Sequence, residues 1–79
     1  MDAEFFVIMP AMNGWDVFHG MDGQGWFARW DDAVEAADVM AVARHEAAGV
    51  PTAVVVEMRN RDAAVVSTYT TQAPAAGSS

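Results

Sequence analysis

One histidine and two aspartates near a predicted strand end are the residues whose types could hold a metal ion. His19 lies between Asp16 and Asp22 in the sequence, and imidazole and carboxylate groups are common metal ligands. A metal site needs three or four converging ligands, and the chain has no HxH, HxxxH or HExxH spacing. We therefore expect neither a metal nor a cofactor. A metal or small-ligand site at Asp16, His19 and Asp22 remains an alternative.

Residues 20–25 (GMDGQG) are rich in glycine, as are loops that bind phosphate. Such loops direct backbone N–H groups at the anion, usually at a helix N-terminus with a Lys or Arg nearby. Here Asp31 and Asp32 follow and would repel phosphate, so we predict a hairpin turn instead. Ser67 lies in a predicted strand without a nucleophile-elbow motif. We expect no catalytic residue and no enzyme.

Large aromatic side chains are concentrated in the first thirty residues. Strand alternation sends Phe5 and Val7 to one face and Phe6 and Ile8 to the other. One helix of small residues can cover only one sheet face, so some large apolar groups should stay uncovered and form a surface for self-association or a partner. Alternatively, loops and methionines cover them, or they are exposed singly. The candidate interaction surface consists of Phe5, Val7, Trp15, Val17 and Trp26.

Four acidic residues form a second feature, on one face of the predicted helix: Asp31, Glu35, Asp38 and Glu46. None has a basic residue four positions away to pair with. Such a face can simply keep the protein in solution. It can also engage a basic protein, as an acidic decoy that resembles a nucleic-acid backbone. Val39 and Val42 lie among these acids and should be partly exposed.

Glycine, proline and asparagine divide the chain into the elements that must position these side chains. We predict strands at residues 4–10 and 15–20 around an Asn13-Gly14 hairpin, and a brief third strand at 26–29. The apolar period changes near residue 31, which predicts a helix over 31–48. Strands at 52–59 and 63–70 follow, around a turn at 60–62. The fold class is α+β with two layers: one antiparallel sheet of four or five strands, in the order ββ(β)αββ, packed on one helix.

The ends of the predicted helix carry recognisable signals. Asp32 with Glu35 is typical of an N-terminal cap, Gly49 can adopt the left-handed C-cap conformation, and Pro51 prevents continuation. We expect the buried helix face to consist of Ala36, Ala37, Met40, Ala43 and Ala47, with Val34 and Ala41 at one edge.

Length and charge exclude several classes of protein. The 79 residues allow one domain, expected over residues 1–70, with a disordered tail at 71–79. The formal net charge of −7 argues against binding to nucleic acid or an anionic membrane. The absence of Cys excludes a disulfide framework, and the longest apolar run, 5–12, is too short to span a bilayer. Because the first residues are acidic where a secretory signal is basic, we expect a cytoplasmic protein.

Several features follow one another in a recognisable order: a strand ending in Pro10, then residues 14–17 (GWDV), Phe27 shortly before an alanine-rich helix, and a last strand pair ending near Tyr69. This order, over roughly residues 4–69, resembles a family of short bacterial proteins, the domain of unknown function 2188 family. The family usually has Ser or Thr as the helix cap where this chain has Arg29 or Trp30, which moves the expected cap to Asp31 or Asp32. Family members also tend to be rich in Lys, and this chain has none. The resemblance implies no activity or cofactor.

Together these observations predict a small, non-enzymatic protein, and the resemblance implies a bacterial one. We expect it to work through protein–protein contact, with an unknown partner or with itself as a homodimer. The two alternatives, a small-ligand or metal-binding domain and an acidic decoy, stay open at this point.

Overall fold

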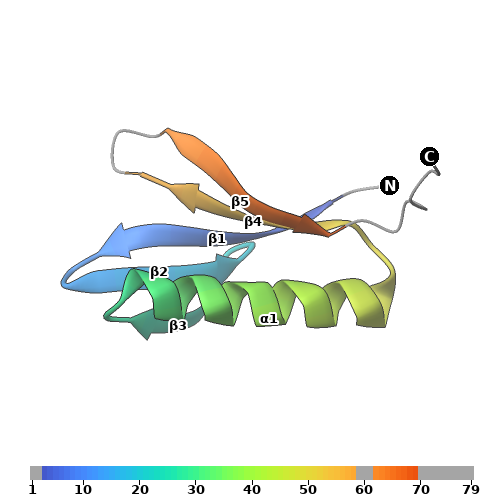
Figure 1. Ribbon diagram of the computed structural model, residues 1–79, viewed down its shortest axis with the longest axis horizontal. Helices are drawn as coiled ribbons and strands as arrows, with labels where there is room; N and C mark the ends of the chain where they lie inside the picture. Colours follow the sequence, from blue (N-terminus) through green and yellow to red (C-terminus); the bar gives the residue numbers. More distant parts are fainter. Residues whose placement is uncertain (1–2, 59–61, 70–79) are drawn as a thin grey trace.

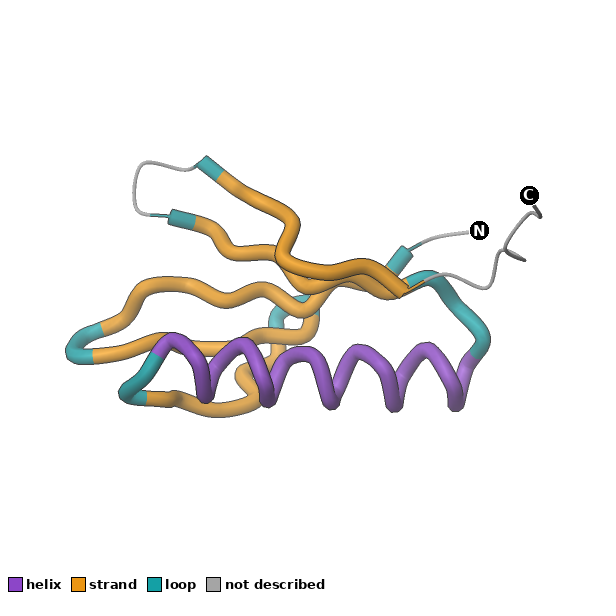
Figure 2. The backbone as a smooth tube through the Cα atoms, in the orientation of Figure 1, coloured by secondary structure: helices purple, strands orange, loops and turns teal. Residues whose placement is uncertain are grey.

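Five strands and one helix form two layers in the computed structural model, which describes residues 3–58 and 62–69. Figures 1 and 2 show the helix lying along one face of the sheet. This confirms the α+β fold with a single helix packed on a single sheet. The elements are β1 (Glu4–Ala11), β2 (Gly14–His19), β3 (Asp22–Phe27), α1 (Trp30–Ala48), β4 (Thr52–Glu57) and β5 (Ala63–Tyr69).

Two tight turns join the first three strands. Asn13, with a φ of 62°, forms the β1–β2 turn with Met12, as residues that tolerate positive φ do in short hairpins. Gly20, with a φ of 64°, forms the next turn with Met21. This second turn is shorter than the glycine-rich segment suggested. The third strand therefore begins at Asp22 rather than at residue 26 and is a full strand of 6 residues.

The strand order is β3-β2-β1-β4-β5, and β1 and β4 are parallel. The expectation that every strand pair is antiparallel is therefore wrong for this central pair, although the other three pairs are antiparallel. The reason is that β3 is a complete strand. After three strands the chain is at the far end of the sheet, and the 19-residue helix, about 28 Å long, carries it back. Consequently β4 starts at the same end as β1 and runs in the same direction (Figure 1).

The helix begins without a side-chain cap. Arg29 is the N-cap residue in an extended conformation, and its side chain makes no capping hydrogen bond, so the predicted cap at Asp31 or Asp32 is wrong. These two aspartates lie in the first turn instead, where they interact favourably with the helix dipole. The predicted C-cap is confirmed, because Gly49 has a φ of 70° and its N–H donates to the carbonyl oxygen of His45 at 2.8 Å.

Three alanines spaced four residues apart bring α1 against the sheet. Ala33, Ala37 and Ala41 are completely buried, whereas Ala43 and Ala47 of the predicted buried face are exposed. The small alanine side chains pack on the apolar side chains of the central strands. From the sheet these are Phe6 and Ile8 of β1, Val17 of β2, and Val54 and Val56 of β4.

Thr52 joins the start of β4 to the second half of the helix. Its side chain is buried, and its hydroxyl donates to the carbonyl oxygen of Ala41 at 3.1 Å. No helix among the described residues is long and apolar enough to cross a membrane. The expected tail at 71–79 and most of the predicted turn at 60–62 lie outside the described residues. At the edge of that turn, the N–H of Met58 donates to the carbonyl oxygen of Asp62.

Candidate functional site

The sheet face opposite α1 carries a group of apolar side chains, which we name the open-face patch. Val7 of β1 pairs with Phe18 of β2 on one side and with Val55 of β4 on the other, and Val55 pairs with Val65 of β5. Paired residues point to the same face, so these four side chains form a row across four strands. Phe5 lies two residues before Val7 on β1. The open-face patch thus comprises Phe5, Val7, Phe18, Trp26, Val55 and Val65.

Three members of the open-face patch are well exposed. Phe5 is 49% exposed, Trp26 is 50% exposed and Val65 is 64% exposed. The Trp26 indole lies over Gly14, where an added Cβ would come within 2.6 Å of the ring. The absence of a side chain at Gly14 therefore leaves room for the indole there. Exposed apolar side chains gathered on one sheet face are characteristic of a protein contact site.

Two residues of the predicted interaction surface lie on the other face. Val17 is completely buried in the core, and Trp15 packs against that core with its ring 4.8 Å from the Trp30 ring in an edge arrangement. The expectation that Trp15 and Val17 belong to the exposed surface is therefore wrong. Phe18, which the sequence analysis did not select, takes their place beside Val7.

The hairpin turn held the signal that could have identified Phe18. A two-residue turn pairs odd-numbered residues of one strand with even-numbered residues of the next. Val7 must then share a face with Phe18, and cannot share one with Val17. For Val55 and Val65 no such local signal exists, because β4 reaches β1 only through the helix.

A hydrogen-bonded cluster of charged side chains joins both layers near the start of β1. Arg44 of α1 donates from Nε and Nη2 to the two carboxylate oxygens of Glu4, at 2.8 and 2.9 Å. His19 Nε2 donates to Glu4 Oε1 at 2.8 Å, and its ring stacks on Phe6 with centroids 4.4 Å apart. The hydrogen bonds from Arg44 and His19 lower the pKa of Glu4 from 4.5 to about 2. The cluster holds α1 to β1 and β2.

The candidate metal ligands do not converge. Asp16 pairs with Met9, and His19 pairs with Phe6, so the two side chains point to opposite faces of β2. Asp22 pairs with His19, but it is exposed at the start of β3, while His19 is bonded to Glu4. Within residues 3–58 and 62–69, no group of three or more His, Asp or Glu side chains could hold a metal ion. The geometry gives no support to a metal site at these three residues.

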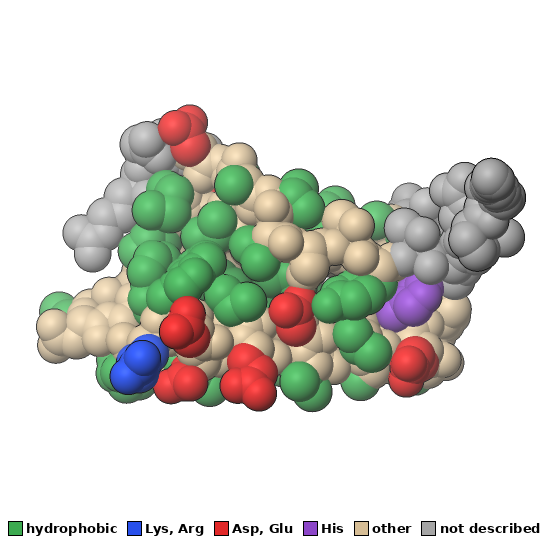
Figure 3. Space-filling model, in the orientation of Figure 1, with side chains coloured by type: hydrophobic (Ala, Val, Ile, Leu, Met, Phe, Trp, Pro, Cys, Tyr) green, Lys and Arg blue, Asp and Glu red, His purple; other side chains and the backbone are tan. Residues whose placement is uncertain are grey.

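Acidic side chains follow α1 on the outside of the molecule, with hydrophobic side chains between them (Figure 3). Asp31, Glu35 and Glu46 are exposed, as expected. Asp38 differs, because it is partly buried and accepts hydrogen bonds from the hydroxyl groups of Ser67 and Tyr69 on β5. One of the four predicted acids therefore helps to hold the edge strand to the helix.

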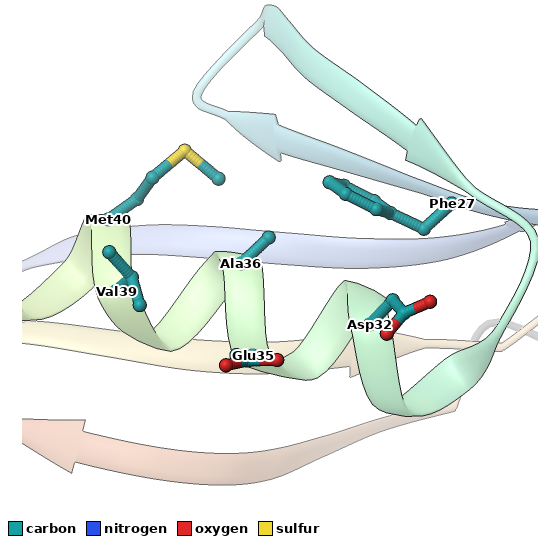
Figure 4. A pocket seen from close by; sticks show the side chains of 6 residues that line it. All are labelled: Phe27, Asp32, Glu35, Ala36, Val39 and Met40. Atoms are coloured by element: carbon teal, nitrogen blue, oxygen red, sulfur yellow. The ribbon is translucent and has the colours of Figure 1, made fainter.

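An apolar groove lies between α1 and β3. It measures about 580 Å³ and is lined by Phe27, Asp32, Glu35, Ala36, Val39 and Met40. Figure 4 shows Phe27 and Met40 at its two ends, with Ala36 between them and the two carboxylates on the helix side. Val39 is 62% exposed, which agrees with the expectation from the helix pattern. The sequence predicted the exposure of Val39 but not the groove, because the groove also needs Phe27, which lies on a separate strand.

Comparisons with family models, with curated proteins and with solved structures found no match to this chain. The resemblance to the domain of unknown function 2188 family therefore stays a prediction that rests on the residues quoted for it.

Proposed function

We propose that this chain is a non-enzymatic protein–protein interaction module that self-associates through the open-face patch. The observation that carries the proposal is the exposure of Phe5, Trp26 and Val65, at 49%, 50% and 64%, on one sheet face. Large apolar side chains gathered on one face lose contact with water when a partner covers them, and this loss stabilises the complex.

The charge distribution supports a second copy as the partner. The chain carries a net charge of −7, so two copies repel each other unless the contact surfaces are neutral. The row formed by Phe18, Val7, Val55 and Val65 contains no charge, and the carboxylates on the same sheet face flank it: Asp16, which pairs with Trp26, and Glu57, two residues after Val55. The acids of α1 lie on the opposite side of the sheet and stay away from such a contact.

The size of the patch predicts a weak dimer. Phe5 and Trp26 each leave about 100 Å² uncovered, taking about 200 Å² for a whole aromatic side chain. With the valines, the patch offers roughly 400 Å² per copy, against about 800 Å² per partner in a standard stable interface. We therefore expect dimerisation in the micromolar range or weaker, as in a reversible contact.

Sedimentation velocity over a concentration series from about 5 μM to 1 mM tests the proposal. The average mass of the wild-type protein should rise from one chain toward two. Val65→Glu places a charge in the patch and should keep the protein monomeric. Met21→Glu adds the same charge at a turn residue that is 96% exposed and outside the patch, and it should associate like the wild type. A wild-type protein that stays monomeric at 1 mM would refute self-association.

We extend the proposal to the cellular context: a cytoplasmic protein, in a bacterial cell as the sequence resemblance implies. This part of the proposal rests on the sequence alone and predicts that the protein fractionates with the bacterial cytosol.

A further inference from the structure

A second apolar surface follows the outer side of α1, away from the open-face patch. The groove described above ends at Val39, and an adjoining hollow of about 320 Å³ is lined by Asp38, Val39, Val42, Ala43 and Glu46. Both depressions are lined by Val39, so they adjoin on the outer side of α1, and we name the pair the outer groove. It runs from Asp32 to Glu46, about 21 Å along the helix axis.

The floor of the outer groove is apolar and unpartnered. Val39 is 62% exposed at its centre, and Ala36, Met40 and Val42 beside it are partly buried. Phe27 of β3 forms one wall. An exposed valine in the middle of such a track gives a partner a point at which to dock an apolar side chain.

The sides of the outer groove are acidic. Asp32 and Glu35 lie along one part of it, and Asp38 and Glu46 along the other. In the described part of the chain, Asp32 and Glu35 form no hydrogen bond or ion pair. Arg29, the exposed N-cap residue, precedes Asp32 by three positions, and Arg44, further along α1, is bonded to Glu4. The groove therefore presents negative charge on the helix beside an apolar surface.

This charge pattern determines the occupant. A second copy of α1 would set four acids against four acids, which is unfavourable. A partner with basic side chains flanking an apolar stripe would complement both features. A helix presents such a stripe at every third and fourth residue, and about four turns of helix match the length of the groove. The hollows are shallow and open to solvent, which suits a helix lying across the surface.

We propose that the outer groove docks a basic amphipathic helix of a partner protein. The partner places its apolar side chains on Val39 and between Phe27 and Met40, and its Lys or Arg side chains beside Asp32, Glu35 and Glu46. This contact is independent of the open-face patch, because the two surfaces lie on opposite sides of the sheet.

Titration with a synthetic 18-residue helical peptide tests the docking site. The peptide carries leucines on one face and lysines on both flanks, and a scrambled peptide of the same composition serves as its control. Calorimetry should detect binding of the amphipathic peptide that is at least about tenfold tighter than binding of the scrambled one. Amide NMR shifts should change at Ala36, Val39 and Phe27, and should stay constant at Val7 and Val55.

A matched pair of variants gives the decisive comparison. Val39→Gln and Val65→Gln change the same residue type at similar exposure, 62% and 64%, on opposite sides of the molecule and leave the net charge unchanged. Val39→Gln should weaken peptide binding about tenfold, because it removes the apolar contact in the middle of the groove. Val65→Gln should leave peptide binding unchanged and should affect only self-association.

Three results would overturn the docking proposal. They are equal binding of the amphipathic and scrambled peptides, equal weakening by both variants, and no binding at 1 mM peptide in low salt. None of these results bears on dimerisation, which is measured without peptide. Failure of self-association would in turn leave the peptide titration interpretable.

Discussion

Replacing Phe5 by alanine tests the open-face patch, because Phe5 is an exposed aromatic residue of the central strand β1. Phe5 leaves 49% of its surface uncovered, about 100 Å² if a whole side chain offers about 200 Å². At about 25 cal/mol per Å², complete coverage would contribute about 2.5 kcal/mol per copy. A two-fold dimer contains the ring twice, which gives an upper limit of about 5 kcal/mol.

Association recovers only part of this limit, because binding also costs translational and side-chain freedom. We expect Phe5→Ala to weaken dimerisation by at least about 1.4 kcal/mol, or tenfold in the dissociation constant. The covered half of the ring also supports the monomer. Its loss should lower the free energy of unfolding by about 2 kcal/mol, roughly half the cost of truncating a fully buried phenylalanine.

Two measurements separate these effects. Sedimentation equilibrium gives the dissociation constant, and urea denaturation of dilute protein gives the stability of the monomer. Met21→Ala removes a side chain that is 96% exposed and lies outside the patch, so both quantities should stay close to wild type. A dissociation constant for folded Phe5→Ala within twofold of wild type would show that the interface lies elsewhere.

Two further predictions concern stability. Ala37→Leu adds bulk at a completely buried helix position and should lower the free energy of unfolding by about 1–3 kcal/mol. Val39→Leu, at an exposed position on the same helix, should change the free energy of unfolding by no more than about 0.5 kcal/mol. Urea denaturation measures both variants, and equal losses of stability would contradict the close packing of α1 on the sheet. The pKa of Glu4 is lowered from 4.5 to about 2, so the stability from its ion pair is complete above the ordinary value and is lost as the pH falls toward 2. Glu4→Gln should therefore make stability less sensitive to acid over this range, measured by denaturation at a series of pH values; identical pH profiles would contradict the assigned role of the Arg44 contact.

The parallel pairing of the two central strands could not be predicted from the sequence, although other parts of the fold could. The first hairpin and the single helix were predictable from turn residues and periodicity. The parallel pairing of β1 and β4 depends on whether residues 22–27 form a full strand. Glycines at positions 23 and 25 favoured a turn, and local propensity concealed a strand that pairing with β2 stabilises.

The buried face of the helix was predictable only in part. Alanine occurs on several sides of α1, at positions 33, 36, 37, 41, 43, 47 and 48. An apolar pattern spread this widely does not define one direction. The sheet selects Ala33, Ala37 and Ala41 and leaves Ala43 and Ala47 exposed, which only the packing of the two layers decides.

The sequence by itself determined the element types, the left-handed cap at Gly49, the exposure of Val39, and an excess of aromatic bulk over what one helix can cover. These depend on neighbours a few residues apart, whose geometry is set by the backbone. Only the tertiary structure decided which rings remain uncovered, that Arg44 bonds Glu4, and that Phe27 forms a groove with α1. These contacts join residues distant in the chain, and their register is fixed by the packing of whole elements, which no local pattern contains.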